Sequence, residues 1–207
     1  AFSLSGGVYA LRWWFRLHRV DPLQPSPDFG AKSMESTLDN EIIKSFSFPH
    51  GEANILYLVN GIFKEELSKI VSPADQLVVK DIKTAFTEDA ETLYQHFGKH
   101  LSHDDAFAAL NTAFGNHGFF VKFAQNKVLS HPVVIYNITD ASSENVVYHS
   151  RNLILAEENS QGHLIEAYQT YGKGKNFVNQ ASEVVIAKSA NIAYYKIQED
   201  EGESYRV

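Results

Sequence analysis

The second half of this sequence carries a degenerate repeat, which restricts the fold more than any other feature. In segments 152–168 and 183–199, three aliphatic residues and an alanine precede a polar turn, and a run with aromatic residues follows. The alanines Ala124, Ala156 and Ala187 are spaced 32 and 31 residues apart. A unit of this length cannot bury its own apolar side chains, so neighbouring units must stack. Each unit is therefore expected to form a strand, a corner with a small residue, and a second strand.

Stacked units of this kind pair their strands in parallel, so the repeat favours a parallel β-helix that begins at residue 116. A sandwich or jelly roll remains open, because short strands with regularly spaced turns fit those folds as well. Helical periodicity is absent after Gly118. When the two units are aligned through their alanines, His163 corresponds to Tyr194, which indicates a packing position. Residues 116–207 are thus interpreted as the first rungs of a β-helix core.

Residues 1–115 are expected to form an N-terminal α/β region. A β-rich run ends at Asn60-Gly61, the dipeptide that most readily gives a tight hairpin turn. A helical turn is expected over 64–70 and a short strand over 77–82. The fold class is therefore mainly β with a helical N-terminal region.

Two helices are expected near 87–115. Thr87 is a candidate cap for the first helix, which Gly98 should end. Asp104 and Asp105 open the second helix, which Gly115 closes.

The segment before residue 34 is rich in proline and glycine. A short helix or strand is expected around 8–20, where Trp13, Trp14 and Phe15 would anchor the segment to the main body. Because the chain starts at Ala1, we expect its natural N-terminus to be missing or processed.

Composition narrows the functional classes. The chain has no cysteine, which excludes disulfides, thiolate catalysis and Cys-ligated zinc or iron–sulfur sites within these residues. A formal charge of -7, without a basic stripe, argues against nucleic-acid binding. No run of about 18 apolar residues is present, so no membrane span is expected. A cytoplasmic protein is expected.

A histidine cluster and a glycine-rich loop resemble binding motifs. His96, His100 and His103 fall near one helical face and, with Asp104, could form a zinc site, but Gly98 interrupts the helix. The segment 172–175, Gly-Lys-Gly-Lys, lacks the spacing of a phosphate-binding loop and is interpreted as a turn.

The remaining motifs are equally weak. Asn137-Ile-Thr139 matches a glycosylation sequon, which has meaning only in a secreted protein. The acids at 157–158 and 199–201 sit on adjacent turn positions and make a poor general acid/base pair. His131 precedes a proline and has no recognisable nucleophile beside it. No catalytic, cofactor-binding or metal-binding residue is therefore assigned, and the chain is expected not to be an enzyme.

Five strings carry a family resemblance, and they occur in the family's order. They are LYLVNGIFKEELS (56–68), DAFAALNTAFGNHGFFVKFAQN (105–126), HPVVIYNI (131–138), RNLILAEENSQGHLIEAY (151–168) and EVVIAKSANIAYYKIQ (183–198). Together they resemble the SufB/SufD family of iron–sulfur cluster assembly proteins over residues 55–207. The short region that leads to the VNG hairpin resembles the SufD type more than the SufB type.

The resemblance implies a right-handed parallel β-helix and a scaffold role in a complex with a SufB-like subunit and a SufC-like ATPase. A homodimer is a further option. Family members are about twice as long, so the chain corresponds to their N-terminal half and the fold is truncated. The iron–sulfur cluster would be handled by the complex, and no cofactor would be bound by this segment.

Two other functional classes remain open. A polysaccharide-acting β-helix enzyme would need clustered Asp, Lys or Arg on one face of successive rungs, whereas the equivalent positions differ, with Glu157 and Glu158 aligned with Lys188 and Ser189. A metal-binding cupin-like barrel rests only on the nine histidines.

The β-helix interpretation also makes two structural predictions. Ile154 and Val185 should both face the packed interior. The last rung, near 194–197, should form an uncapped edge prone to self-association.

Overall fold

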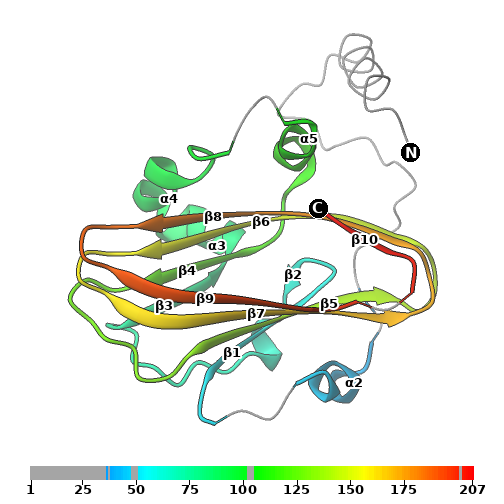
Figure 1. The fold of residues 1–207 in the computed structure, drawn as a ribbon, viewed down its shortest axis with the longest axis horizontal. Coiled ribbons are helices and arrows are strands. Elements are labelled where there is room, and N and C mark those ends of the chain that lie inside the picture. The colour runs from blue at the N-terminus through cyan, green and yellow to red at the C-terminus, as the bar shows by residue number, and fades with distance from the viewer. Residues whose placement is uncertain (1–35, 37, 48–50, 102–104, 201) are drawn as a thin grey trace.

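Two β-sheets lie face to face in the computed structural model, with helices on their outer sides (Figure 1). The structure describes residues 36, 38–47, 51–101, 105–200 and 202–207. The first sheet has the order β2-β1-β5-β7-β9 and the second β10-β8-β6-β4-β3. The strands of the first sheet are β1 (Asn54–Val59), β2 (Ile62–Phe63), β5 (Val133–Ala141), β7 (Gln161–Gly172) and β9 (Asn191–Glu199). Those of the second are β3 (Leu77–Asp81), β4 (Phe119–Phe123), β6 (Val146–Ala156), β8 (Asn176–Ile186) and β10 (Ser204–Arg206).

From β5 onward, successive strands alternate between the two sheets. Strands that are neighbours in a sheet pair in parallel, with Val133 opposite Leu164 and Gln161 opposite Asn191. Two antiparallel pairs, β1 with β2 and β3 with β4, lie at the ends of the two sheets opposite β9 and β10. Both sheets are therefore mixed, and the prediction of a mainly β chain with helices is confirmed.

The register of the repeat differs by one residue from the alignment through alanines. Ala156 lies opposite Ile186 rather than Ala187, and His163 lies opposite Ala193 rather than Tyr194. The turns set this register: Asn126, Asn159 and Ser189 each take a positive φ of about 60°. Asparagine tolerates the left-handed conformation better than most residues, so these positions, and not the alanines, mark equivalent points of successive turns.

The segment between β1 and β4 folds largely as expected. Asn60 and Gly61 both have positive φ and close the hairpin of β1 and β2. Next come η1 (Glu65–Leu67) and β3, which were both predicted. Residues 8–20 and their aromatic cluster lie outside the described residues.

A helix that the sequence did not predict precedes the first predicted helix. α3 (Ile82–Glu88) begins after Asp81, whose carboxylate accepts a hydrogen bond from the backbone N of Lys83 at 2.8 Å. The helix predicted to end at Gly98 is α4 (Ala90–His96), which begins after Asp89 and ends just before Gly98. The assignment of Thr87 as its cap is wrong, because Thr87 lies inside α3.

The other helices lie on opposite sides of the molecule. α5 (Ala106–Phe114) is capped by Asp105 and ends at Gly115, as predicted, and it lies with α3 and α4 over the second sheet (Figure 1). α2 (Asn40–Ser45) covers the outer face of the first sheet.

Three apolar clusters hold the layers together. The inter-sheet cluster includes Phe123, Ile135, Ile154 and Leu164, so the prediction that Ile154 faces inward is confirmed. Val185 instead packs with the cluster beneath α3 and α4, on the outer face. The prediction for Val185 is wrong because Leu155, not Ile154, is its neighbour in register.

The last strand of the first sheet forms an edge. β9 pairs only with β7 among the described strands, and its Tyr194, Tyr195 and Ile197 are exposed by 36%, 54% and 39%. An edge near 194–197 is therefore present, and its predicted tendency to self-associate stays a prediction.

Candidate functional site

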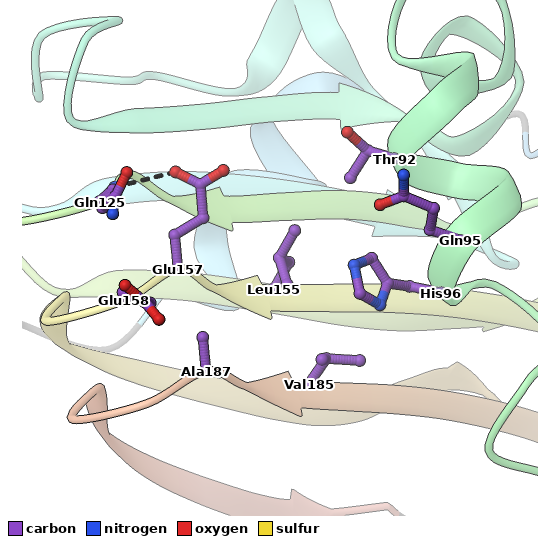
Figure 2. A pocket seen from close by; sticks show the side chains of 9 residues that line it. All are labelled: Thr92, Gln95, His96, Gln125, Leu155, Glu157, Glu158, Val185 and Ala187. Atoms are coloured by element: carbon purple, nitrogen blue, oxygen red, sulfur yellow. Dashed lines mark hydrogen bonds between the residues drawn. The ribbon is translucent and has the colours of Figure 1, made fainter.

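A shallow pocket of about 300 Å³ lies between α4 and the turns that follow β4 and β6 (Figure 2). Leu155 and Val185 contribute apolar side chains, and His96 lies beside Leu155 at the end of α4. Glu157 projects toward the turn after β4, where its Oε2 accepts a hydrogen bond from the backbone N of Gln125 at 2.9 Å. The pocket thus combines apolar and polar side chains.

The histidine cluster is only partly visible in this pocket. His96 lines it, His100 follows the end of α4, and His103 and Asp104 lie outside the described residues. Within the described ranges, no three His, Cys, Asp or Glu side chains gather closely enough to hold a metal ion. The structure therefore provides no support for the zinc site.

The glycine-rich segment 172–175 connects β7 to β8, as the sequence analysis predicted. Gly172 has a φ of +94°, and a Cβ there would lie 2.4 Å from the carbonyl oxygen of Ala141. Glycine is needed because the backbone at Ala141 and Ser142 approaches closely at this corner.

The sequon residues Asn137 and Thr139 lie on β5 with exposed fractions of 3% and 0%. They are inaccessible to a glycosylating enzyme in the folded chain. His131 precedes β5, and His163 is exposed on β7. None of these residues joins a cluster of candidate catalytic groups.

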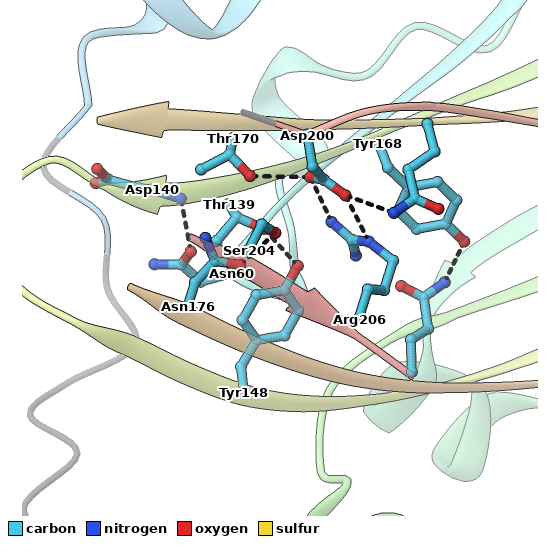
Figure 3. A network of polar contacts seen from close by, with 12 residues as sticks. Asn60, Thr139, Asp140, Tyr148, Tyr168, Thr170, Asn176, Asp200, Ser204 and Arg206 are labelled. Carbon is cyan, nitrogen blue, oxygen red and sulfur yellow. Dashed lines mark hydrogen bonds and ion pairs between the residues drawn. The ribbon is translucent and has the colours of Figure 1, made fainter. Parts of the chain in front are cut away.

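The most extensive polar arrangement lies between the sheets, where β10 crosses the end of the stack (Figure 3). Asp200 accepts hydrogen bonds from Arg206 Nε at 3.0 Å and Nη2 at 2.9 Å. Thr170 Oγ1 and Gln198 Nε2 also donate to Asp200, at 2.9 and 3.0 Å. Arg206 lies 4.4 Å from the ring centroid of Tyr168. This geometry closes the end of the inter-sheet space with a bidentate ion pair.

Burial and the ion pair act in opposite directions on these two groups. Burial would raise the pKa of Asp200, but the hydrogen bonds and charge of Arg206 outweigh it and lower the pKa. Likewise, burial would lower the pKa of Arg206, but Asp200 raises it. Both groups are therefore held in their charged forms.

A buried carboxylate lies deeper between the sheets. Glu166 is fully buried and accepts hydrogen bonds from the hydroxyls of Tyr168 and Tyr194, the latter at 2.7 Å. Burial, followed by the charge of Glu166, raises the pKa of both phenols. The two tyrosines therefore act as hydrogen-bond donors and not as bases.

A second buried ion pair fastens the helical segment to the second sheet. Glu183 accepts hydrogen bonds from the backbone N of Gly98 at 2.7 Å and of His100 at 2.9 Å. Its Oε2 lies 3.4 Å from Arg151 Nη2, and the side chains are only 6% (Arg151) and 1% (Glu183) exposed. This pair positions the turn after α4 over β6 and β8.

Sequence reasoning missed the residues of these networks. Glu166, Tyr168 and Thr170 alternate along β7, at positions that face the opposite sheet and would ordinarily be apolar. Polar residues at alternate positions of a buried strand are the signal that could have indicated them. Asp200 was included in an acidic run but interpreted as a solvated turn.

The geometry defines a mainly β protein whose strands are shared between two stacked mixed sheets, with helices over the outer faces. Two family models match the chain: "SufBD protein N-terminal region" over residues 23–135, and "SUF system FeS cluster assembly, SufBD core domain" over residues 137–207. The chain belongs to the SufBD family of iron–sulfur cluster assembly proteins.

Individual relatives agree with the family models. An iron–sulfur cluster assembly SufBD family protein of Synechocystis sp. is 23% identical over 188 residues, which are 87% of this chain and 41% of the relative. Proteins of the same description from Staphylococcus aureus strains MRSA252 and USA300 are 30% and 29% identical over 59% of this chain and 26% of their own length. The matched part thus covers less than half of each of these relatives.

These matches give no support to a polysaccharide-acting enzyme. They also do not separate the SufD type from the SufB type, since the family models and the relatives carry the joint family description. Within the parts of the chain that the structure describes, no helix has the length and apolar character to cross a membrane.

Proposed function

We propose that this chain forms the first part of a SufD-type subunit, which serves as a non-enzymatic scaffold in a SufB–SufC–SufD complex. The observation that carries the proposal is the pair of stacked sheets in a chain of the SufBD family. The SufD type is favoured by the likeness of the hairpin segment, residues 56–68, to that type. A cytoplasmic location goes with this role.

The alternation of strands favours a parallel β-helix as the finer description of the fold. Each step from one sheet to the other and back adds one strand to each sheet, with Val146 opposite Asn176 and Gln161 opposite Asn191. A framework of this kind offers strand edges and faces to neighbouring subunits. The iron–sulfur cluster is the cargo of the complex, and we assign no residue of this segment to bind it.

Co-purification tests the scaffold role. The tagged protein would be expressed with the SufB-type and SufC-type proteins of its own organism and recovered at low salt. We expect both partners to be retained, and Ile154→Asp, which disrupts the inter-sheet core, to abolish their retention. Recovery of neither partner by a chain with native circular dichroism would contradict the proposal. Recovery of a homodimer alone would favour self-association instead.

A further inference from the structure

The space between the sheets changes from apolar to polar along the strands. Ile135, Ile154 and Leu164 belong to the inter-sheet apolar cluster. Side chains alternate across a strand, so positions two or four residues away on the same strand also face inward. These inward positions are occupied by Asn137, Ser150 and Glu166. On β8, the inward position opposite Ser150 is Gln180. An apolar core therefore borders directly on buried polar side chains.

The polar side chains form one layer across the two sheets. Asn137 and Tyr168 are neighbours in register on the first sheet, and Ser150 and Gln180 are neighbours on the second. The Tyr168 hydroxyl joins the sheets, because it accepts a hydrogen bond from Gln180 Nε2 at 2.9 Å and donates one to Glu166. Tyr168 thus contacts Glu166 and Gln180, while Asn137 and Ser150 lie beside Tyr168 and Gln180 in register. These five residues are called the polar layer below.

Four side chains of the polar layer each keep a buried atom without a hydrogen-bond partner in the protein. The atoms are Asn137 Nδ2, Ser150 Oγ, Glu166 Oε1 and Gln180 Oε1. Asn137, Ser150 and Glu166 are 3%, 1% and 0% exposed. Buried polar groups in native proteins are nearly always satisfied, by protein or by ordered water. A group of four in one layer is a strong departure from that rule.

The atoms are chemically complementary to water. An amide N–H group needs an acceptor, the carboxylate and carbonyl oxygens need donors, and the serine hydroxyl can do both. A buried water molecule typically makes two to four such bonds. We propose that the polar layer is an internal binding site for water, in which at least one ordered molecule bridges these groups between the sheets.

Water fits this layer better than a metal cation. Asn137 presents a donor nitrogen, which a cation would repel. The carboxylate of Glu166 already accepts from two phenols, Tyr168 and Tyr194, so its charge is partly satisfied. The layer also lacks a second carboxylate at these positions.

Magnetic relaxation dispersion of ¹⁷O water counts internal waters with long residence times and tests the proposal on the intact protein. The double variant Asn137→Leu/Ser150→Ala removes two of the partners. We expect it to lose dispersion amplitude equivalent to at least one water, and its Tm to fall by about 2–4 °C. Ser182→Ala is the matched control, because Ser182 Oγ already accepts from Asn152 Nδ2 at 3.1 Å. The control should keep the amplitude.

Two results would overturn the proposal. One is a dispersion amplitude that is equal in the protein and in the double variant, together with an unchanged or higher Tm. If no water is bound, removal of a buried polar group without a hydrogen-bond partner relieves a desolvation penalty and does not lower Tm. The other is a high-resolution crystal structure in which the layer holds an ion at metal–oxygen distances. If the double variant fails to fold, the single variant Ser150→Ala, which removes one oxygen atom only, decides between the same outcomes.

Discussion

Replacement of Glu183 by alanine should detach the helical segment from the second sheet. Glu183 is 2% exposed and accepts from two backbone N–H groups, those of Gly98 and His100, besides facing Arg151. The substitution leaves both N–H groups without their acceptor. It also leaves Arg151, which is 5% exposed, as a buried charge without its counter-ion.

Breaking a buried ion pair by removal of one partner is destabilising by about 3–5 kcal/mol. Arg151 keeps two other contacts, a hydrogen bond to Thr112 Oγ1 at 3.1 Å and the ring of Phe97 at 4.8 Å. We therefore expect the lower end, about 3 kcal/mol. For a chain of this length, this corresponds to a fall in Tm of about 6–12 °C.

Urea unfolding followed by circular dichroism measures the loss, and hydrogen exchange at the Gly98 and His100 amides locates it. The control is the double variant Arg151→Leu/Glu183→Leu, which removes both charges and should be less destabilised than Glu183→Ala. A loss below about 1 kcal/mol for Glu183→Ala would refute the reasoning, because that is the range of an exposed pair. The reasoning would also be refuted if the double variant lost as much unfolding free energy as Arg151→Leu and Glu183→Leu lose together.

Three further changes test other parts of the structure. Ile154→Asp should unfold the chain in urea titrations, since it buries an unpaired charge, whereas Val128→Asp, at a position 63% exposed, should not. Burial lowers the pKa of His149 and of His117, so stability should fall as pH drops below about 6.5, and thermal melts of His149→Phe should show a weaker dependence, with the remainder due to His117. The pKa of Asp200 is lowered because Arg206 outweighs burial, so its contribution is present above about pH 3.9 and lost in stronger acid. Asp200→Asn should flatten the melting profile in that range.

The sequence predicted the strands and their stacking because each unit repeats the same order of apolar run, turn and strand. Local chemistry also placed the hairpin at Asn60-Gly61 and the helix between Asp105 and Gly115. The register failed by one residue, since alanine is compatible with many positions. The positive φ at Asn126, Asn159 and Ser189 marks equivalent turn positions and so defines the register. The sequence does not reveal this marker in the third turn, because serine stands there in place of asparagine.

The buried networks could not be predicted from the sequence because their members are far apart along the chain. Glu183 meets the turn at Gly98 across 85 positions, and neither residue carries a local signal for the other. Asp200 and Arg206 are close in sequence but pair only because β10 crosses to the second sheet. Acidic residues near a chain turn are usually solvated, so the same pattern seldom indicates burial.

The change from apolar to polar between the sheets alters what holds successive strands in place. Along one part of the strands, apolar side chains such as Phe123, Ile154 and Leu164 fill the inter-sheet cluster, so the hydrophobic effect fixes the register there. Further along the strands, Glu166 and Gln180 occupy inward positions, where directional hydrogen bonds fix the register instead. A hydrogen bond contributes less net free energy than a buried aliphatic side chain, but it tolerates fewer arrangements. The polar part of the inter-sheet space is therefore specified more by hydrogen-bond geometry than by burial.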